Sequence, residues 1–269
     1  SINMKVPPKR LYILTGKGGV GKTSLAMAMT KHLESTGHNV KYNSFYQEPE
    51  RTLWKKLALP VLDIDLNTSA EIYIGRKLNS KTIASWIMKT HFFKSLFQMI
   101  PGLGHMILLG HILDELDKNP DLVIVLDSPA SGHALTMFES SSNFKKIFRA
   151  GLIVKDIEKM HSFLSRPGHL KTLIVSLATE LAINEARDLQ NELANSNGPD
   201  LNVELMVNDS YLKYLKDNHI DEKDLPDFLK NKIELEKEII GNIKSLPHID
   251  ESEQVGVIEE LAPHMGAFL

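Results

Sequence analysis

The sequence predicts a single α/β domain with a mostly parallel, doubly wound sheet and helices on both faces. Strand-like apolar runs alternate with helical segments along the 269 residues, as in a parallel sheet with crossover helices. A glycine-rich octapeptide, Gly16–Thr23, joins the first of these strands to a helix. We place one domain at residues 4–269, with a helical elaboration at about 53–119 and an outer helical layer at about 209–243.

Five strands are predicted from runs of apolar, β-branched and aromatic residues. In chain order they are Leu11–Leu14, Val40–Phe45, Leu122–Asp127, Thr172–Leu177 and Val203–Asn208. The last three are almost continuously apolar, as central strands are when helices cover both faces of a sheet. Ligands of such sheets bind at the carboxyl ends of the strands, so the residues that end these strands are the first candidates for a site.

The octapeptide Gly16–Thr23 fits the pattern G-x-x-x-x-G-K-[ST], the phosphate-binding P-loop. The strand before it and the helix formers of Ser24–Leu33 after it supply the context that the motif requires. Glycines let backbone amides approach phosphates closely, and the helix start adds a partial positive charge. The sequence therefore predicts a P-loop NTPase domain. Its expected nucleotide-binding residues are Gly16, Gly18, Gly19, Val20, Gly21, Lys22, Thr23 and Ser24.

Two further side chains complete the expected site. In a P-loop, the lysine (here Lys22) reaches the β- and γ-phosphates, and the hydroxyl (here Thr23) holds Mg²⁺. Asp127 ends an apolar strand, which is the Walker B position that contacts Mg²⁺ directly or through water. Strand-end aspartates also cap helices, but a P-loop in the same chain favours the metal role. Beyond it, Gly132 is a candidate amide donor to a γ-phosphate, and His133 is either a phosphate sensor or a structural residue.

The composition restricts the class of protein. The net charge is −3, so no global basic field indicates nucleic acid or an anionic membrane as partner. The sequence has no cysteine, which excludes disulfides, thiolate zinc sites and cysteine-ligated iron–sulfur clusters. It has no run of 18 apolar residues and no recognisable signal peptide. We expect a cytoplasmic protein that binds no nucleic acid and does not insert into membranes.

One helical stretch has two interpretations. Met106, Leu109, Leu113 and Leu116 share one helical face, which indicates core packing. The alternative is a hydrophobic surface for a partner or client protein, because further methionine and phenylalanine side chains cluster nearby. These are Met88, Phe92, Phe93, Phe97 and Met99.

The motifs together resemble a known group. Lys17, directly after Gly16, makes the P-loop similar to the deviant Walker A of the MinD/ParA/arsenite-pump branch of ATPases. The segment Asp127–Leu135 is similar to the D-T-A-P-T-G-H-T-L of ArsA-like ATPases, which include arsenite-pump ATPases and tail-anchored-protein targeting factors. Pro101-Gly102 before a helix and Val207-Asn208 after a strand extend the resemblance over most of residues 9–210.

The resemblance implies Mg²⁺-dependent ATP hydrolysis to ADP in a dimer, with Lys17 crossing to the partner's phosphates. A cationic finger of this kind contributes about 10³–10⁵ in rate. The residues alone leave other orientations of Lys17 open, toward solvent or back onto its own chain. The resemblance also implies that Asn208 contacts adenine and that an adenine-stacking loop lies near Leu246-Pro247-His248.

Three departures from the family pattern limit what it implies. Where the family has D-P-A-H in switch I, this chain has Glu48-Pro49-Glu50-Arg51, so Glu48 is the candidate to orient the attacking water, with Gln47 as the alternative. No Cys-x-x-Cys is present, which excludes the zinc of some targeting-factor dimers and cysteine-based metalloid binding. The segment Ala134–Pro167 is also short for a large client groove.

The favoured function is a nucleotide-gated dimeric ATPase, homodimeric or paired with a related ATPase, that controls binding of a partner or client protein. A ParA/MinD-like positioning protein is a second hypothesis, but Glu251–Leu269 lacks the basic amphipathic helix of a membrane anchor. A third is a nucleotide-binding subunit with little turnover that acts with an active homologue, which the altered switch I suggests.

Overall fold

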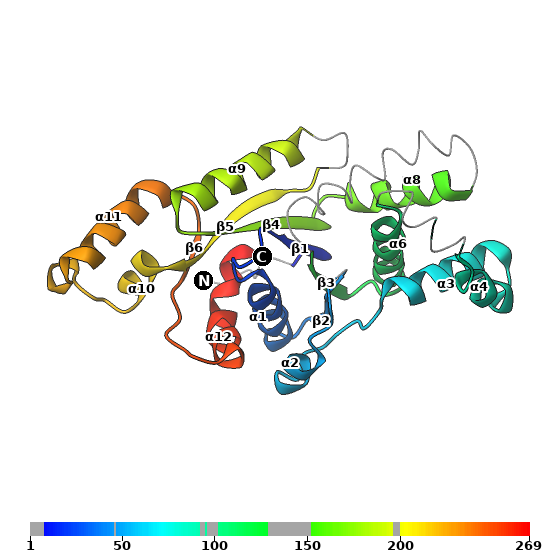
Figure 1. Cartoon of the computed structure of the whole chain (residues 1–269), viewed down its shortest axis with the longest axis horizontal. Helices are drawn as coiled ribbons and strands as arrows, with labels where there is room; N and C mark the ends of the chain where they lie inside the picture. The colour runs from blue at the N-terminus through cyan, green and yellow to red at the C-terminus, as the bar shows by residue number, and fades with distance from the viewer. Residues whose placement is uncertain (1–7, 46, 92–94, 96–101, 129–151, 196–199) are drawn as a thin grey trace, which may run out of the picture.

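The computed structural model describes residues 8–45, 47–91, 95, 102–128, 152–195 and 200–269. They form a six-stranded, all-parallel sheet in the order β2-β3-β1-β4-β5-β6, with helices on both faces (Figure 1). The strands are β1 (Leu11–Thr15), β2 (Asn39–Asn43), β3 (Leu122–Asp127), β4 (Leu170–Leu177), β5 (Val203–Ser210) and β6 (Ser245–Pro247). The predicted fold class and all five predicted strands are confirmed.

The first strand of the chain lies in the middle of the sheet. Leu11 of β1 is paired with Ile124 of β3 on one side and with Leu170 of β4 on the other. The edge strand β6 was not predicted, because three residues carry too little pattern to identify a strand. It pairs with β5 near the carboxyl end of the sheet, where Pro247 lies opposite Ser210.

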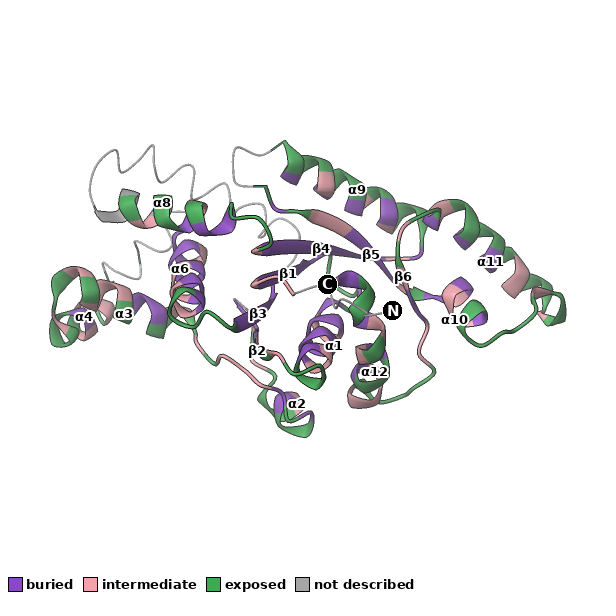
Figure 2. Cartoon of the chain, turned by 180° about the vertical axis from the view of Figure 1, so that it is seen from behind, coloured by how far each residue is buried: buried purple, intermediate pink, exposed green. Residues whose placement is uncertain are grey.

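One face of the sheet is covered by helices from both ends of the chain. These are α1 (Lys22–Ser35), α2 (Arg51–Lys56), α12 (Gln254–Leu261) and the 3₁₀ segment η2 (Ala262–Phe268). Leu25 and Met29 of α1 share a buried core with Ile258 and Phe268. Figure 2 shows that most of α1 is buried. The segment of α12 and η2 is therefore part of the core and packs against α1.

The opposite face is covered by α6 (Leu103–Lys118), α8 (Leu152–Leu164) and α9 (Glu180–Ala194). The face of Met106, Leu109, Leu113 and Leu116 is buried here, so its interpretation as core packing is confirmed. The helix α3 (Leu66–Leu78) packs outside α6, and α4 (Lys81–Met88) packs on α3. Phe92, Phe93, Phe97 and Met99 lie outside the described residues. Within the described ranges, no helix is long and apolar enough to cross a lipid bilayer.

The predicted outer layer consists of α10 (Tyr211–Asp217), the 3₁₀ turn η1 (Glu222–Asp224) and α11 (Asp227–Ile240). It is less solvated than expected, because Glu236 of α11 is fully buried. The Glu236 carboxylate accepts hydrogen bonds from the backbone N–H groups of Tyr211 and Leu212, at 3.2 and 2.7 Å. A buried carboxylate thus caps the start of α10 and ties it to α11.

Candidate functional site

The glycine-rich loop leaves the carboxyl end of β1 and enters α1, as the motif predicts. Two of its glycines are required by space. A Cβ on Gly16 would lie 2.6 Å from the carbonyl oxygen of Val175, and Gly16 has φ +150°. A Cβ on Gly21 would lie 2.5 Å from Nδ2 of Asn208, and Gly21 has φ +84°. The loop is therefore pressed against β4 and β5, and only glycine permits that approach.

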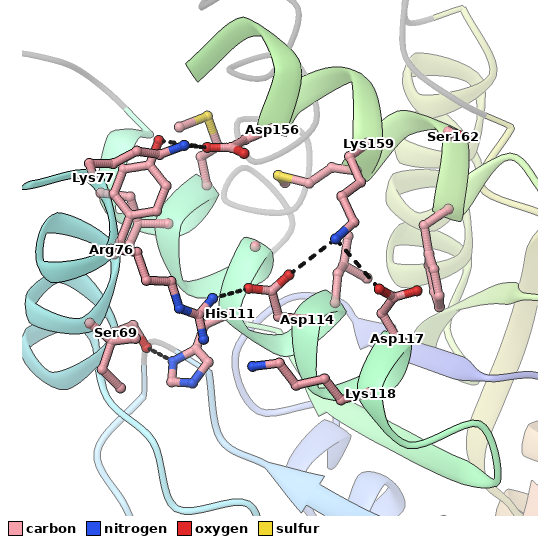
Figure 3. A pocket seen from close by; sticks show the side chains of 18 of the residues that line it. Ser69, Arg76, Lys77, His111, Asp114, Asp117, Lys118, Asp156, Lys159 and Ser162 are labelled. Atoms are coloured by element: carbon pink, nitrogen blue, oxygen red, sulfur yellow. Dashed lines mark hydrogen bonds and ion pairs between the residues drawn. The ribbon is translucent and has the colours of Figure 1, made fainter. Parts of the chain in front are cut away.

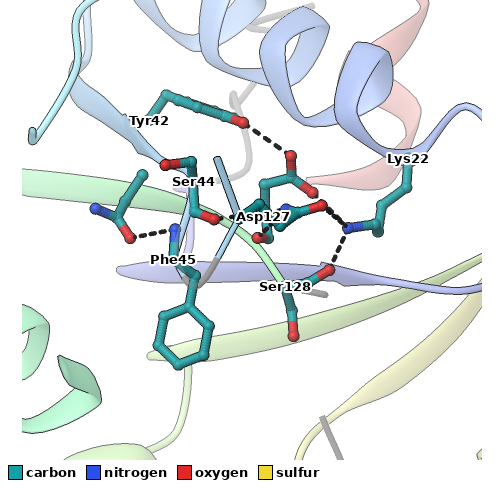
Figure 4. A network of polar contacts seen from close by, with 8 residues as sticks. Lys22, Tyr42, Ser44, Phe45, Asp127 and Ser128 are labelled. Carbon is teal, nitrogen blue, oxygen red and sulfur yellow. Dashed lines mark hydrogen bonds and ion pairs between the residues drawn. The ribbon is translucent and has the colours of Figure 1, made fainter. Parts of the chain in front are cut away.

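Lys22 lies at the centre of a polar network at the carboxyl edge of the sheet (Figure 4). Its ammonium group donates to Oδ1 of Asp127 at 2.8 Å, to Oε1 of Gln47 at 3.0 Å and to the backbone oxygen of Ser128. An ammonium group has three donors, so these three acceptors use all of them. The two predicted catalytic side chains Lys22 and Asp127 are thus in direct contact, in a buried ion pair with side chains 8% and 1% exposed.

The Asp127 carboxylate is held on its other side by Tyr42. The Tyr42 hydroxyl donates to Oδ2 of Asp127 at 2.8 Å. Burial, and then the negative charge of Asp127, raise the pKa of the Tyr42 hydroxyl far above its ordinary value, so the hydroxyl stays protonated and can donate. Both carboxylate oxygens therefore have a partner, as a buried charge requires.

Gln47, and not Glu48, reaches into this network. Its Nε2 donates to the backbone oxygen of Asp127 at 2.8 Å, while its Oε1 accepts from Lys22. Glu48 is exposed to solvent. The structure therefore places the alternative residue, and not the first candidate, beside the P-loop lysine.

Thr23 and Ser24 form the first turn of α1 and are half-buried. Ser24 accepts a hydrogen bond from Nε2 of Gln254 at 3.2 Å, which joins this turn to the start of α12. The Thr23 hydroxyl and the Asp127 carboxylate are hard oxygen donors at the same edge of the sheet, which is the donor chemistry that Mg²⁺ prefers. The residues present fit a magnesium ion held together with phosphate oxygens.

The exposed part of the loop carries Lys17. Its side chain is 58% exposed, and Nζ lies 2.6 Å from Oε1 of Glu185 on α9. Gly18 and Gly19 beside it are also exposed. In this single chain, Lys17 is therefore held by its own chain, which is one of the orientations that the residues alone left open.

The predicted base-binding residues lie at the ends of β5 and β6. Asn208 donates from Nδ2 to the backbone oxygen of Val20 at 3.0 Å, which places its amide against the P-loop. Pro247 is buried in β6 and does not lie in a loop. The next residue, His248, stacks on Tyr211 with ring centroids 4.6 Å apart and contacts Asp209 at 2.6 Å. An aromatic pair, His248 with Tyr211, thus lies at the predicted segment.

A separate cavity of about 500 Å³ lies between α3, α6 and α8 (Figure 3). Met106 and Phe163 contribute apolar walls, and ion pairs cross its rim. Lys159 of α8 lies 3.8 Å from Asp114 and 3.5 Å from Asp117 of α6. This charged rim differs from the apolar client surface that the sequence suggested as an alternative for these helices.

Three site residues were not found by sequence reasoning alone. Tyr42 occupies an ordinary strand position, and only the parallel pairing of β2 with β3 brings it beside Asp127. Glu185 is five residues beyond the start of an amphipathic helix and looks like a solvated helix residue. His248 was assigned to the right segment, but its stacking on Tyr211 depends on the unpredicted strand β6. Gly132 and His133 lie outside the described residues.

The glycine loop joins a central parallel strand to a helix, and its lysine pairs with the aspartate that ends the neighbouring strand. This arrangement defines a P-loop NTPase domain. The family model for anion-transporting ATPases matches residues 9–172, more than half of the chain. The protein belongs to this ArsA ATPase family, and the family indicates an ATPase that binds nucleotide. A comparison with curated proteins gave no match.

Proposed function

We propose that this protein is a cytoplasmic Mg²⁺-dependent ATPase that works as a nucleotide-gated dimeric switch and controls the binding of a partner or client protein. The observation that supports this best is the contact of Lys22 with Asp127 at 2.8 Å, at the edge where β1 and β3 end side by side. Both residues are where a nucleotide phosphate and its metal would be bound.

Nucleotide binding would have to rearrange this network. All three donors of Lys22 are used by protein acceptors, so phosphate oxygens must replace some of them. Gln47 follows β2, and Ser128 follows β3. A phosphate that displaces either acceptor from Lys22 therefore also moves the loop that carries that acceptor. This exchange couples phosphate occupancy to the positions of both loops, which is the basis of a switch.

Mg²⁺, when bound, neutralises charge on the phosphates, and Thr23 and Asp127 are the residues that would hold it. Lys22 would bind the β- and γ-phosphates in place of Asp127. Gln47 is in position to orient the attacking water through its side-chain amide, and Glu48 would act only after its loop moves inward. Asn208 and the His248–Tyr211 pair would bind the adenine ring, next to Pro247 of β6 in the chain.

The dimer follows from Lys17, which we expect to reach the phosphates of the partner subunit. It must first leave Glu185. An exposed ion pair of this kind contributes only about 0–1 kcal/mol, so it opposes the movement weakly. A single subunit would hydrolyse ATP slowly, because the cationic finger contributes about 10³–10⁵ in rate.

The test is turnover by the purified protein. Lys22→Ala and Asp127→Ala are expected to abolish Mg²⁺-dependent ATP hydrolysis, and Lys17→Ala to reduce it to the level of an isolated subunit. Lys216→Ala, which removes an exposed lysine of α10, is the control and should leave turnover unchanged. Light scattering with ADP and with ATP should show a dimer that depends on nucleotide. Unchanged turnover in both Lys22→Ala and Asp127→Ala would refute the proposal.

A second candidate is a nucleotide-binding subunit with little turnover of its own, which acts with a more active homologue. It is favoured by the exposed position of Glu48, which leaves a neutral amide, Gln47, as the switch I side chain that contacts Lys22. Tight ATP binding without hydrolysis by the protein alone, and hydrolysis after a related ATPase is added, would support this candidate over the first.

A further inference from the structure

Tyr42 contacts the site from the side opposite to Lys22. The Asp127 carboxylate lies between the two: Oδ1 accepts from the ammonium group of Lys22, and Oδ2 accepts from the hydroxyl of Tyr42, each at 2.8 Å (Figure 4). Tyr42 and Asp127 are almost completely buried, each 1% exposed. The contact between Tyr42 and Asp127 is therefore shielded from bulk solvent.

The position of Tyr42 is fixed by its surroundings. Its backbone N–H donates to Pro60, and its backbone oxygen accepts from Leu62, while β2 also pairs with β3. Its ring packs against the edge of Trp54, with centroids 5.9 Å apart. A hydroxyl on such a support keeps its direction when neighbouring loops move.

The two partners of Asp127 differ in what happens to them on nucleotide binding. Lys22 is in the P-loop and, under the proposed function, moves to the phosphates. Tyr42 lies on the far side of the carboxylate, within the core formed with α1 and α12. Tyr42 can therefore keep its hydrogen bond to Asp127 when Lys22 moves.

We propose that Tyr42 is a positioning residue: its hydroxyl holds one oxygen of the Asp127 carboxylate throughout the nucleotide cycle, so that the other oxygen faces the metal when Lys22 departs. This inference rests on the proposed function and adds a residue to it. Outer partners of metal ligands typically change metal affinity by about 10–100-fold when they are removed.

The chain offers a matched control. Tyr12 is a second fully buried tyrosine in the same core, on β1, which β3 separates from β2. Its hydroxyl accepts a hydrogen bond from the backbone N–H of Lys9 at 2.9 Å. Tyr42→Phe and Tyr12→Phe both remove one buried hydroxyl and keep the ring. Only the first change removes a hydrogen bond to the Asp127 carboxylate.

The experiment measures binding of fluorescent ADP to the purified full chain, first in EDTA and then across a Mg²⁺ titration. Tyr42→Phe is expected to bind ADP normally in EDTA and to raise the Mg²⁺ midpoint about 10-fold, while Tyr12→Phe matches the wild type in both. In an Asp127→Asn background, Tyr42→Phe should cause no further shift. A Mg²⁺ midpoint in Tyr42→Phe equal to that of the wild type would overturn the inference.

Two other outcomes are separable. A wild type that binds no ADP with or without Mg²⁺ contradicts the proposed function, whereas an unshifted midpoint in a binding protein contradicts only the role of Tyr42. If Tyr42→Phe is too unstable for this titration, urea unfolding tests the same contact. The loss of stability caused by Tyr42→Phe is expected to be smaller in an Asp127→Asn background than in the wild type, because a hydrogen bond to a carboxylate is stronger than one to an amide. An equal loss in both backgrounds overturns the inference.

Discussion

Replacing the P-loop lysine should destabilise this protein before any nucleotide is present. In Lys22→Met the long apolar stem is kept and the ammonium group is lost. Asp127, 1% exposed, then retains only Tyr42 as a partner for its charge. The variant commonly used to block nucleotide binding would here also bury a carboxylate that lacks its cation.

The size of the effect follows from the geometry. At 2.8 Å and an effective dielectric constant of about 20, the gross attraction of the pair is about 6 kcal/mol, most of which offsets desolvation. Removing one member of a buried pair typically costs about 3–5 kcal/mol. The remaining hydrogen bond from Tyr42 reduces this by about 1 kcal/mol, so we expect a loss of about 2–4 kcal/mol.

Urea unfolding in EDTA, without nucleotide, measures this loss. With an m-value of about 3 kcal/mol per M, the midpoint should fall by about 1 M. Adding Asp127→Asn to Lys22→Met should restore most of the loss, because no buried charge is left unpaired. Lys216→Met on the exposed side of α10 is the control and should change stability by less than about 0.5 kcal/mol. A Lys22→Met midpoint equal to that of the wild type would refute the reasoning.

Three further predictions concern other parts of the structure. Gly21→Ala should destabilise the protein and abolish ATP binding, because the new Cβ would meet Asn208. In Gly18→Ala the new Cβ meets no atom within 4 Å, so this variant should bind ATP. Equal binding by both variants would contradict the close approach of the P-loop to Asn208. Phe268→Ala should lower the free energy of unfolding by about 3–5 kcal/mol, and a loss below about 1 kcal/mol in urea would show that the tail packs loosely. Burial lowers the pKa of His111, so below about pH 6.5 the unfolded chain binds a proton that the native state does not. The free energy of unfolding should therefore fall between pH 7.5 and 5.5, and it should fall less steeply in His111→Gln. An equal fall in both proteins would contradict this.

The sheet was predictable because each central strand is an uninterrupted apolar run. Leu122–Asp127 was identified with its observed bounds, since burial on both faces leaves no polar residue inside the strand. The edge strand β6 was missed because it has no such run: it is short and depends on pairing with β5 for its identity. The placement of the C-terminal tail against α1 also follows from tertiary contacts that no local pattern reports.

The site, like the sheet, was predicted only in part. Lys22, Thr23 and Asp127 were predicted because a motif fixes the P-loop residues and a strand end fixes the aspartate. The contact of Lys22 with Asp127 follows from the register that sets Leu14 opposite Asp127, which the sequence does not state. Tyr42 and Glu185 reach the site from β2 and α9, so their roles depend on the strand order.

The central place of β1 has a consequence for how the chain is made. The ribosome produces Leu11–Thr15 early, but its neighbours β3 and β4 end at Asp127 and Leu177. At about 5–20 residues per second, the strand waits on the order of ten seconds with both edges unpaired. Such a segment is open to non-native pairing with other chains. Yield of folded protein should therefore depend on chaperones that shield nascent chains, and the phosphate-binding loop cannot mature until well over half of the domain has been synthesised.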